Sequence, residues 1–78
     1  MAKYQLTQDI YMTEDLYVPE GFPVTKSNLV DERIAAANEL KGWTPVIITH
    51  AKSLHTGDLE ELDIQTHWLK TTELKEVN

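Results

Sequence analysis

Residues 27–49 read SNLVDERIAAANELKGWTPVIIT, and this stretch predicts a helix that passes through a stop signal into a strand. Ser27 or Asn28 is expected to cap the helix, because a side-chain oxygen there accepts hydrogen bonds from the first free backbone N–H groups. Gly42 is expected to end it, since glycine adopts the left-handed conformation that closes helices. The stretch therefore indicates a folded α+β unit.

The apolar residues of the predicted helix recur at spacings of four, three and three, which is typical of one buried face. This stripe consists of Val30, Ile34, Ala37 and Leu40. The strand from Pro45 to Ile48 has no polar alternation, so it is expected to be covered on both faces and to lie at the sheet centre. We also expect Trp43 and Trp68 in the core.

The N-terminal third predicts short antiparallel strands. Alternation from Lys3 to Met12 predicts a strand with a bend near Gln8 and Asp9, followed by a polar turn. Residues 16–25 are expected to form a hairpin that turns at Val18-Pro19-Glu20-Gly21. Because proline cannot donate a ladder hydrogen bond, Pro23 indicates an edge position.

The C-terminal third leaves more than one interpretation open. Asp58 is expected to cap a short turn over residues 59–62, while residues 58–74 fit either a strand or a helix. A strand through about Leu69 is favoured, with Leu62, Ile64, Thr66 and Trp68 on one face. Residues 71–78 are expected to form a short helix or a frayed tail.

The fold class that follows is a single small α+β domain covering residues 1–78. It is expected to hold an N-terminal β-meander or hairpin, one central amphipathic helix packed on an antiparallel or mixed sheet, and a C-terminal strand or short helix. A chain of this length buries a modest core, so self-association into a homodimer is an open alternative.

Composition limits the classes of partner. Thirteen acidic residues against seven basic ones give a formal net charge of −6. That charge opposes direct binding of nucleic acid or an anionic membrane but is compatible with a basic protein surface. The chain lacks cysteine, an apolar leader and any stretch long enough to span a bilayer, which favours a reducing cytoplasm.

The chemistry-bearing residues match no catalytic, cofactor-binding or metal-binding pattern. His50 and His67 would face each other if their strands paired, and Asp58 or Asp63 would then complete a mixed zinc site. Their spacing lacks the HExxH and CxxC…HxxxH patterns, so ordinary strand and loop histidines are the favoured interpretation. We therefore predict no enzyme, no cofactor and no metal.

Aromatic and acidic residues indicate a contact surface instead. Tyr11 and Tyr17 fall on the strand parity opposite their apolar neighbours, and tyrosine is a favoured anchor of protein interfaces. The alternative is that both pack under the helix or form a cross-strand pair. The predicted partner-binding residues are Tyr11, Glu14, Asp15, Tyr17, Glu20, Phe22, Asp58, Glu60, Glu61 and Asp63.

Residues 17–26, YVPEGFPVTK, resemble a segment of the small T7-type phage inhibitors of bacterial RNA polymerase, which has the pattern YVPxGFxVT followed by a basic residue. The resemblance covers ten of 78 residues. In that family the helix precedes the segment, whereas here it is expected to follow. The resemblance favours a small phage-type regulatory protein, and we do not transfer the family's inhibitory function or binding residues.

The predicted function is that of an acidic, non-enzymatic protein-binding module that regulates or inhibits a larger partner protein. One form of it is DNA mimicry, in which acidic side chains cover a basic nucleic-acid-binding surface of the partner. Two alternatives come from other classes. The first is a self-associating structural or virion subunit, and the second is a histidine-based metal enzyme.

Overall fold

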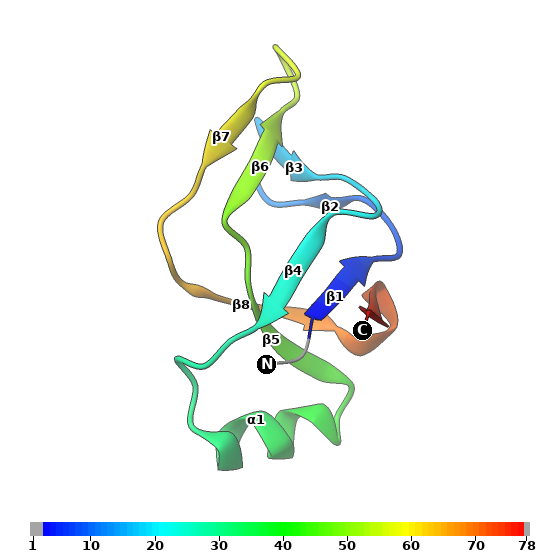
Figure 1. Cartoon of the computed structure of the whole chain (residues 1–78), viewed down its shortest axis with the longest axis vertical. Helices are drawn as coiled ribbons and strands as arrows, with labels where there is room; N and C mark the ends of the chain where they lie inside the picture. Colours follow the sequence, from blue (N-terminus) through cyan, green and yellow to red (C-terminus); the bar gives the residue numbers. More distant parts are fainter. Residues whose placement is uncertain (1–2, 78) are drawn as a thin grey trace.

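The computed structural model describes residues 3–77, which form two antiparallel sheets and one α-helix (Figure 1). Sheet A has the order β8 (Thr66–Lys70), β5 (Trp43–Ile47), β4 (Pro23–Lys26), β1 (Lys3–Leu6) and β9 (Leu74–Val77). Sheet B has the order β2 (Ile10–Tyr11), β3 (Leu16–Val18), β6 (His50–Ser53) and β7 (Leu59–Glu61). The α-helix α1 (Glu32–Glu39) joins β4 to β5, and the 3-10 helix η1 (Thr71–Glu73) joins β8 to β9. The predicted α+β class is confirmed.

The chain passes repeatedly from one sheet to the other. The bend predicted near Gln8 and Asp9 separates β1 in sheet A from β2 in sheet B. The connections from β3 to β4, from β5 to β6 and from β7 to β8 cross in the same way. Neither sheet is therefore built from one continuous part of the chain.

One core lies between the two sheets. Its buried members come from both of them, and they are Leu6, Val18, Val24, Val46, Ile48, Ala51 and Leu69. Partly buried apolar side chains, among them Tyr4, Ile10, Met12 and Phe22, pack around this cluster. Burial of these apolar surfaces is the main favourable contribution to folding.

The predicted hairpin over residues 16–25 is wrong, because its two strands belong to different sheets. The turn lies one residue later than predicted, and the Phe22 N–H donates to the Pro19 carbonyl at 3.1 Å. The same turn is held by β1, since the Gly21 N–H donates to the Leu6 carbonyl at 2.8 Å. Pro23 is the first residue of the interior strand β4 and not of an edge strand, a position that proline tolerates.

The helix begins later than predicted. Its N-cap is Asp31, whose Oδ1 accepts a hydrogen bond from the Arg33 N–H at 2.8 Å. Ser27 is instead buried, and its hydroxyl lies 2.7 Å from that of Thr66 on β8. The predicted stop is confirmed, because Gly42 has a φ of 90°.

The buried face of α1 also differs from the predicted stripe. Ile34 and Leu40 are 53% and 91% exposed, and Ala35 is the buried residue of the helix. One turn further on, the Glu39 carboxylate lies 2.7 Å from the Lys26 ammonium on β4. This hydrogen bond raises the pKa of Lys26. A small buried side chain and a half-exposed ion pair therefore lie on the face of α1 that meets the sheet.

Both tryptophans were predicted in the core, and both are more than one-third exposed. Trp68 lies opposite Pro45 in the β5–β8 pair, on the outer face of sheet A. The opposite face of β8 supplies Leu69 to the core. The predicted strand is therefore observed, but it buries Leu69 and not the face that carries Thr66 and Trp68. Strand β5 lies next to the central strand β4 rather than at the centre itself.

The two remaining C-terminal predictions need correction as well. Residues 59–61 form β7 instead of a capped turn, and β7 pairs with β6. Of residues 71–78, Thr71–Glu73 form the short 3-10 helix η1, whereas Leu74–Val77 form β9, a C-terminal strand paired with β1 and not a helix or a tail. Asn78 lies outside the described residues. Among residues 3–77, we find no helix with the length and apolar character needed to cross a membrane.

Two isoleucines of opposite burial test the position of the core. Ile48 is 1% exposed and Ile64 is 76% exposed. Ile48→Ala is expected to lower the free energy of unfolding by about 2–5 kcal/mol, because it leaves a cavity between the sheets. Ile64→Ala is expected to lower it by less than about 0.5 kcal/mol. Urea unfolding followed by circular dichroism measures both, and equal losses would contradict the core described here.

Candidate functional site

The outer face of sheet B carries a continuous row of side chains across all four strands. Strand pairing places Tyr11 opposite Tyr17, Tyr17 opposite Lys52, and Lys52 opposite Leu59. Residues that lie opposite each other in an antiparallel pair share a face of the sheet. We call this row, with the adjacent pair His50 and Glu61, the tyrosine face.

Strand alternation explains why this face points away from the core. In β3, Val18 follows Tyr17, and in β6, Ala51 precedes Lys52. Val18 and Ala51 are both fully buried. Successive side chains in a strand point to opposite faces. Burial of the Val18 and Ala51 side chains therefore directs the tyrosine face to solvent.

The two tyrosines form a stacked cross-strand pair. Their ring centroids are 5.8 Å apart with an interplanar angle of 23°. Tyr11 is 66% exposed and Tyr17 is half-buried, so the stacked pair presents an aromatic surface to solvent. At the other end of the row, Leu59 is 54% exposed. The cross-strand pair was one form of the alternative to a contact surface, and it is observed together with the exposure of Tyr11; the other form, packing under the helix, is not observed.

The turns beside the tyrosine face are acidic and are joined to each other. Glu14 and Asp15 lie in the β2–β3 turn, where the Thr13 hydroxyl accepts hydrogen bonds from the N–H groups of Asp15 and Leu16. Asp15 Oδ1 lies 2.7 Å from His55 Nε2 in the β6–β7 turn. The Leu54 N–H also donates to the Asp15 carbonyl at 2.8 Å. Two acidic turns are thereby held at the same end of sheet B.

Three of the four predicted acidic residues near β7 lie in that strand or directly before it, and they differ in the face on which they lie. Asp58 precedes the strand, while Glu60 and Glu61 lie within it, and all three are exposed. Glu61 lies opposite His50 on the tyrosine face, whereas Glu60 lies opposite Ala51 and points to the other side of the sheet edge. The fourth residue, Asp63, lies in the link to β8 and lines a cavity between the sheets.

Two predicted residues lie elsewhere. Glu20 is in the turn that is bonded to β1, and its N–H donates to Asp9 Oδ1 at 2.7 Å. Phe22 packs against the core, so it is not an exposed anchor like Tyr11. Five of the predicted acidic residues therefore lie in sheet B or its turns, and among these Glu61 shares the face of the two tyrosines; the five are Glu14, Asp15, Asp58, Glu60 and Glu61.

The part of the molecule that holds sheet B is much more acidic than the part that holds sheet A and α1. Residues 7–22 and 48–65, which hold sheet B and its turns, contain eight acidic residues and one basic residue, Lys52. The other described residues, which hold sheet A and α1, contain five acidic and six basic residues. The formal charges are thus −7 and +1. Sheet B and α1 lie toward opposite ends of the long axis, along which the molecule extends 39 Å (Figure 1).

His50 and His67 do not face each other, as the mixed zinc site considered above would have required. His50 is in sheet B and His67 is in sheet A, and β6 does not pair with β8. Within residues 3–77, no three side chains of the His, Cys, Asp or Glu type gather closely enough to hold a metal ion. Burial lowers the pKa of His67, so its imidazole is neutral at pH 7.

Sequence reasoning missed three members of the tyrosine face, namely His50, Lys52 and Leu59. A local signal was present for two of them, since His50 and Lys52 alternate with the small residues Ala51 and Ser53. Leu59 had no such signal, because its place depends on pairing with β6.

Comparison with known proteins adds no relative. A scan against protein-family models produced no match, and neither did searches of curated proteins and of solved structures. The tyrosine face is therefore interpreted from its own geometry.

The lowered pKa of His67 has a consequence for stability. As the pH falls from about 7.5 to 5.5, the unfolded chain takes up a proton at this residue more readily than the folded protein does, which lowers the free energy of unfolding. Removing the group in His67→Phe is expected to make stability less dependent on pH in this window.

Urea unfolding at a series of pH values measures the effect. His50→Phe is the matched control, because it replaces a histidine on the tyrosine face, away from the space between the sheets that His67 faces. Asp63, which lines the same cavity as His67, is present in all three proteins. Equal pH dependence in His67→Phe and the unmodified protein would contradict the interpretation.

Proposed function

We propose that this chain is a non-enzymatic protein-binding module that docks its tyrosine face on a larger partner protein and thereby regulates or inhibits it. The observation that carries the proposal is the stacked Tyr11–Tyr17 pair, presented to solvent on a sheet whose opposite side is the core. Exposed aromatic rings held in one orientation lose little conformational entropy on binding, which suits them as interface anchors.

The charge distribution supports a basic partner. The part of the chain that bears the tyrosine face has a formal charge of −7. A surface rich in lysine and arginine would be attracted over a distance of about 8–10 Å at physiological salt, and its encounter with this end would be accelerated. The partner we propose therefore combines a basic rim with a recess that accepts an aromatic ring.

A basic nucleic-acid-binding surface fits this description, so DNA mimicry is the specific form of the proposal. The acidic side chains of the β2–β3 turn and of β7 would occupy the positions of phosphates on that surface. Duplex DNA would then compete with this protein for the partner, because both bind the same cationic side chains.

Self-association through the same face is the weaker candidate. A dimer formed there would bring together two surfaces with a formal charge of −7 each. Such like-charge contact disfavours association, and it does so most at low salt. Sedimentation at several protein concentrations distinguishes the two, since a dimer through this face would gain mass with concentration and lose that gain in Tyr11→Ala.

The first test changes the aromatic surface. Tyr11→Ala is expected to weaken binding of the partner about 10- to 30-fold, because it removes an exposed anchor and leaves the core intact. Leu40→Ala is the matched control, since Leu40 is an exposed apolar residue at the end of α1. Capture from a bacterial lysate followed by mass spectrometry identifies the partner, and binding to the purified partner is then measured by titration calorimetry.

A captured protein supports the proposal only if it is retained by Leu40→Ala, lost by Tyr11→Ala and displaced by duplex DNA. Recovery of the same proteins by all three forms would contradict a role of the tyrosine face. If excess DNA does not displace a partner that depends on Tyr11, DNA mimicry is contradicted, while docking through the tyrosine face is still supported.

The second test changes charge without changing shape. Glu60→Gln/Glu61→Gln is expected to slow association with the partner several-fold at low salt and to flatten its salt dependence. Glu32→Gln/Glu76→Gln removes the same charge from the part of the molecule that holds α1 and sheet A, and it is expected to have a much smaller effect. Stopped-flow or biosensor kinetics at 50 and 300 mM salt measures both, and equal effects would contradict the proposed orientation.

A further inference from the structure

Strand β8 is an edge of sheet A, and no strand within residues 3–77 pairs with its free side. Trp68, in the middle of β8, lies opposite Pro45, whose carbonyl accepts a hydrogen bond from the Ser27 N–H at 2.9 Å. Because this carbonyl points toward β4, the Pro45–Trp68 pair is of the type that exchanges no ladder hydrogen bonds. The N–H and C=O groups of Trp68 therefore point to the free edge.

The first and last residues of β8 share this direction. Hydrogen-bonded and non-hydrogen-bonded pairs alternate along an antiparallel ladder, so the backbone groups of Thr66 and Lys70 also point to the free edge. Two hydrogen bonds agree with this alternation. The Lys70 N–H donates to Glu73 Oε1 at 2.8 Å, and the next N–H, that of Thr71, donates to the Gly42 carbonyl at 2.8 Å. A further strand would thus find every backbone group of this edge available except the Lys70 N–H.

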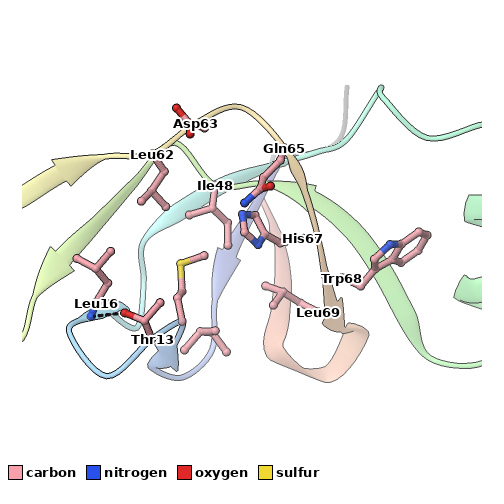
Figure 2. Close-up of a pocket in the computed structure, with 11 residues that line it drawn as sticks. Thr13, Leu16, Ile48, Leu62, Asp63, Gln65, His67, Trp68 and Leu69 are labelled. Carbon is pink, nitrogen blue, oxygen red and sulfur yellow. Dashed lines mark hydrogen bonds between the residues drawn. The ribbon is translucent and has the colours of Figure 1, made fainter.

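The side chain at the middle of this edge is apolar and more than one-third exposed. Figure 2 shows the indole of Trp68 pointing away from His67 and Leu69, which lie toward the core. Trp68 lines one shallow hollow with Trp43 and with Ile34 of α1, both of which are exposed. An edge strand with an exposed apolar side chain is a template for pairing with another strand.

A second copy of β8 fits this edge. In an antiparallel pair centred on Trp68, the two copies of Trp68 lie opposite each other, and Thr66 lies opposite Lys70 of the second copy. Each of these pairs joins backbone groups that point to the free edge. Lys70 keeps its hydrogen bond to Glu73, while its carbonyl accepts from the Thr66 N–H of the second copy. No like charges lie opposite each other, and the two indoles form an aromatic cross-strand pair.

The other three sheet edges of the described residues are less suited to pairing with themselves. β2 has two residues, and it lies with β7 in the part of formal charge −7. The one β7 register that joins outward-pointing backbone groups over more than one residue pair places Glu60 opposite Glu60. The corresponding β9 registers place Lys75 opposite Lys75 or Glu76 opposite Glu76. Like charges directly opposite each other destabilise a strand pair.

We propose that two copies of this chain form a symmetric dimer through their β8 edges, which joins the two copies of sheet A into one continuous antiparallel sheet with Trp68 at the two-fold axis. β8 lies in the part of the molecule with a formal charge of +1, so the repulsion that disfavours a dimer through the tyrosine face is much weaker here. The contact does not use the tyrosine face, and it is independent of the proposed protein partner.

The register is tested by placing charges at its centre. In sedimentation equilibrium over a hundredfold range of concentration, the unmodified protein is expected to approach twice the monomer mass. Trp68→Lys and Trp68→Glu are each expected to weaken this association at least tenfold, because each places like charges opposite each other. An equimolar mixture of the two variants is expected to regain the dimer, since the charges are then opposite. Val77→Lys, at the other edge of sheet A, is the matched control and is expected to dimerise normally.

Amide hydrogen exchange of the unmodified protein gives a second measurement that needs no variant to fold. The Trp68 N–H is expected to exchange at least tenfold more slowly at the highest protein concentration than at the lowest. The neighbouring Leu69 N–H points toward β5, so its exchange is expected to change much less. A mass that stays monomeric, a gain in mass lost in Val77→Lys or Tyr11→Ala, or Trp68 exchange that is independent of concentration would each overturn the proposal.

Discussion

The packing of both sheets on one small core is the constraint on which the rest of this structure depends. Val18, Val46, Ile48 and Ala51 are at most 1% exposed, and they come from strands of both sheets or from the links between them. Because the chain crosses between the sheets at four connections, removing a side chain from this core affects both sheets together. The tyrosine face lies on the opposite side of sheet B from this core, so burial of Val18 and Ala51 is what directs it to solvent.

The local features of the fold were predictable because their causes lie within a few residues. Gly42 ends the helix because glycine adopts a positive φ without strain. The bend near Gln8 divides the predicted strand over residues 3–12, whose alternation of apolar and polar residues is otherwise clear, into β1 and β2. The outward direction of Tyr11 and Tyr17 likewise follows from parity with Ile10 and Val18. These predictions needed no knowledge of what the segments touch.

The failed predictions share a dependence on distant partners. Strand β9 forms because Lys3–Leu6 supplies a free edge at the other end of the chain, and nothing in residues 74–77 indicates that edge. The hairpin over residues 16–25 is replaced by two sheets because Leu6 takes the turn's hydrogen bonds. The helix turns Ala35 inward and leaves Ile34 in solvent against the periodic pattern, and the same face brings Glu39 to Lys26 of β4. For the candidate site, the aromatic pair was accessible from the sequence, whereas Leu59 and the cavity around His67 were not.

The separation of charge along the molecule has a physical effect that precedes any contact. A formal charge of −7 around sheet B and +1 around sheet A and α1, in a molecule 39 Å long, amounts to a large permanent dipole moment. In the field of a positively charged surface such a molecule rotates before it arrives, so that its acidic end leads. A torque of this kind biases the orientation of diffusional encounters with such a surface, and the stacked tyrosines lie on the end that it turns toward the positive charge.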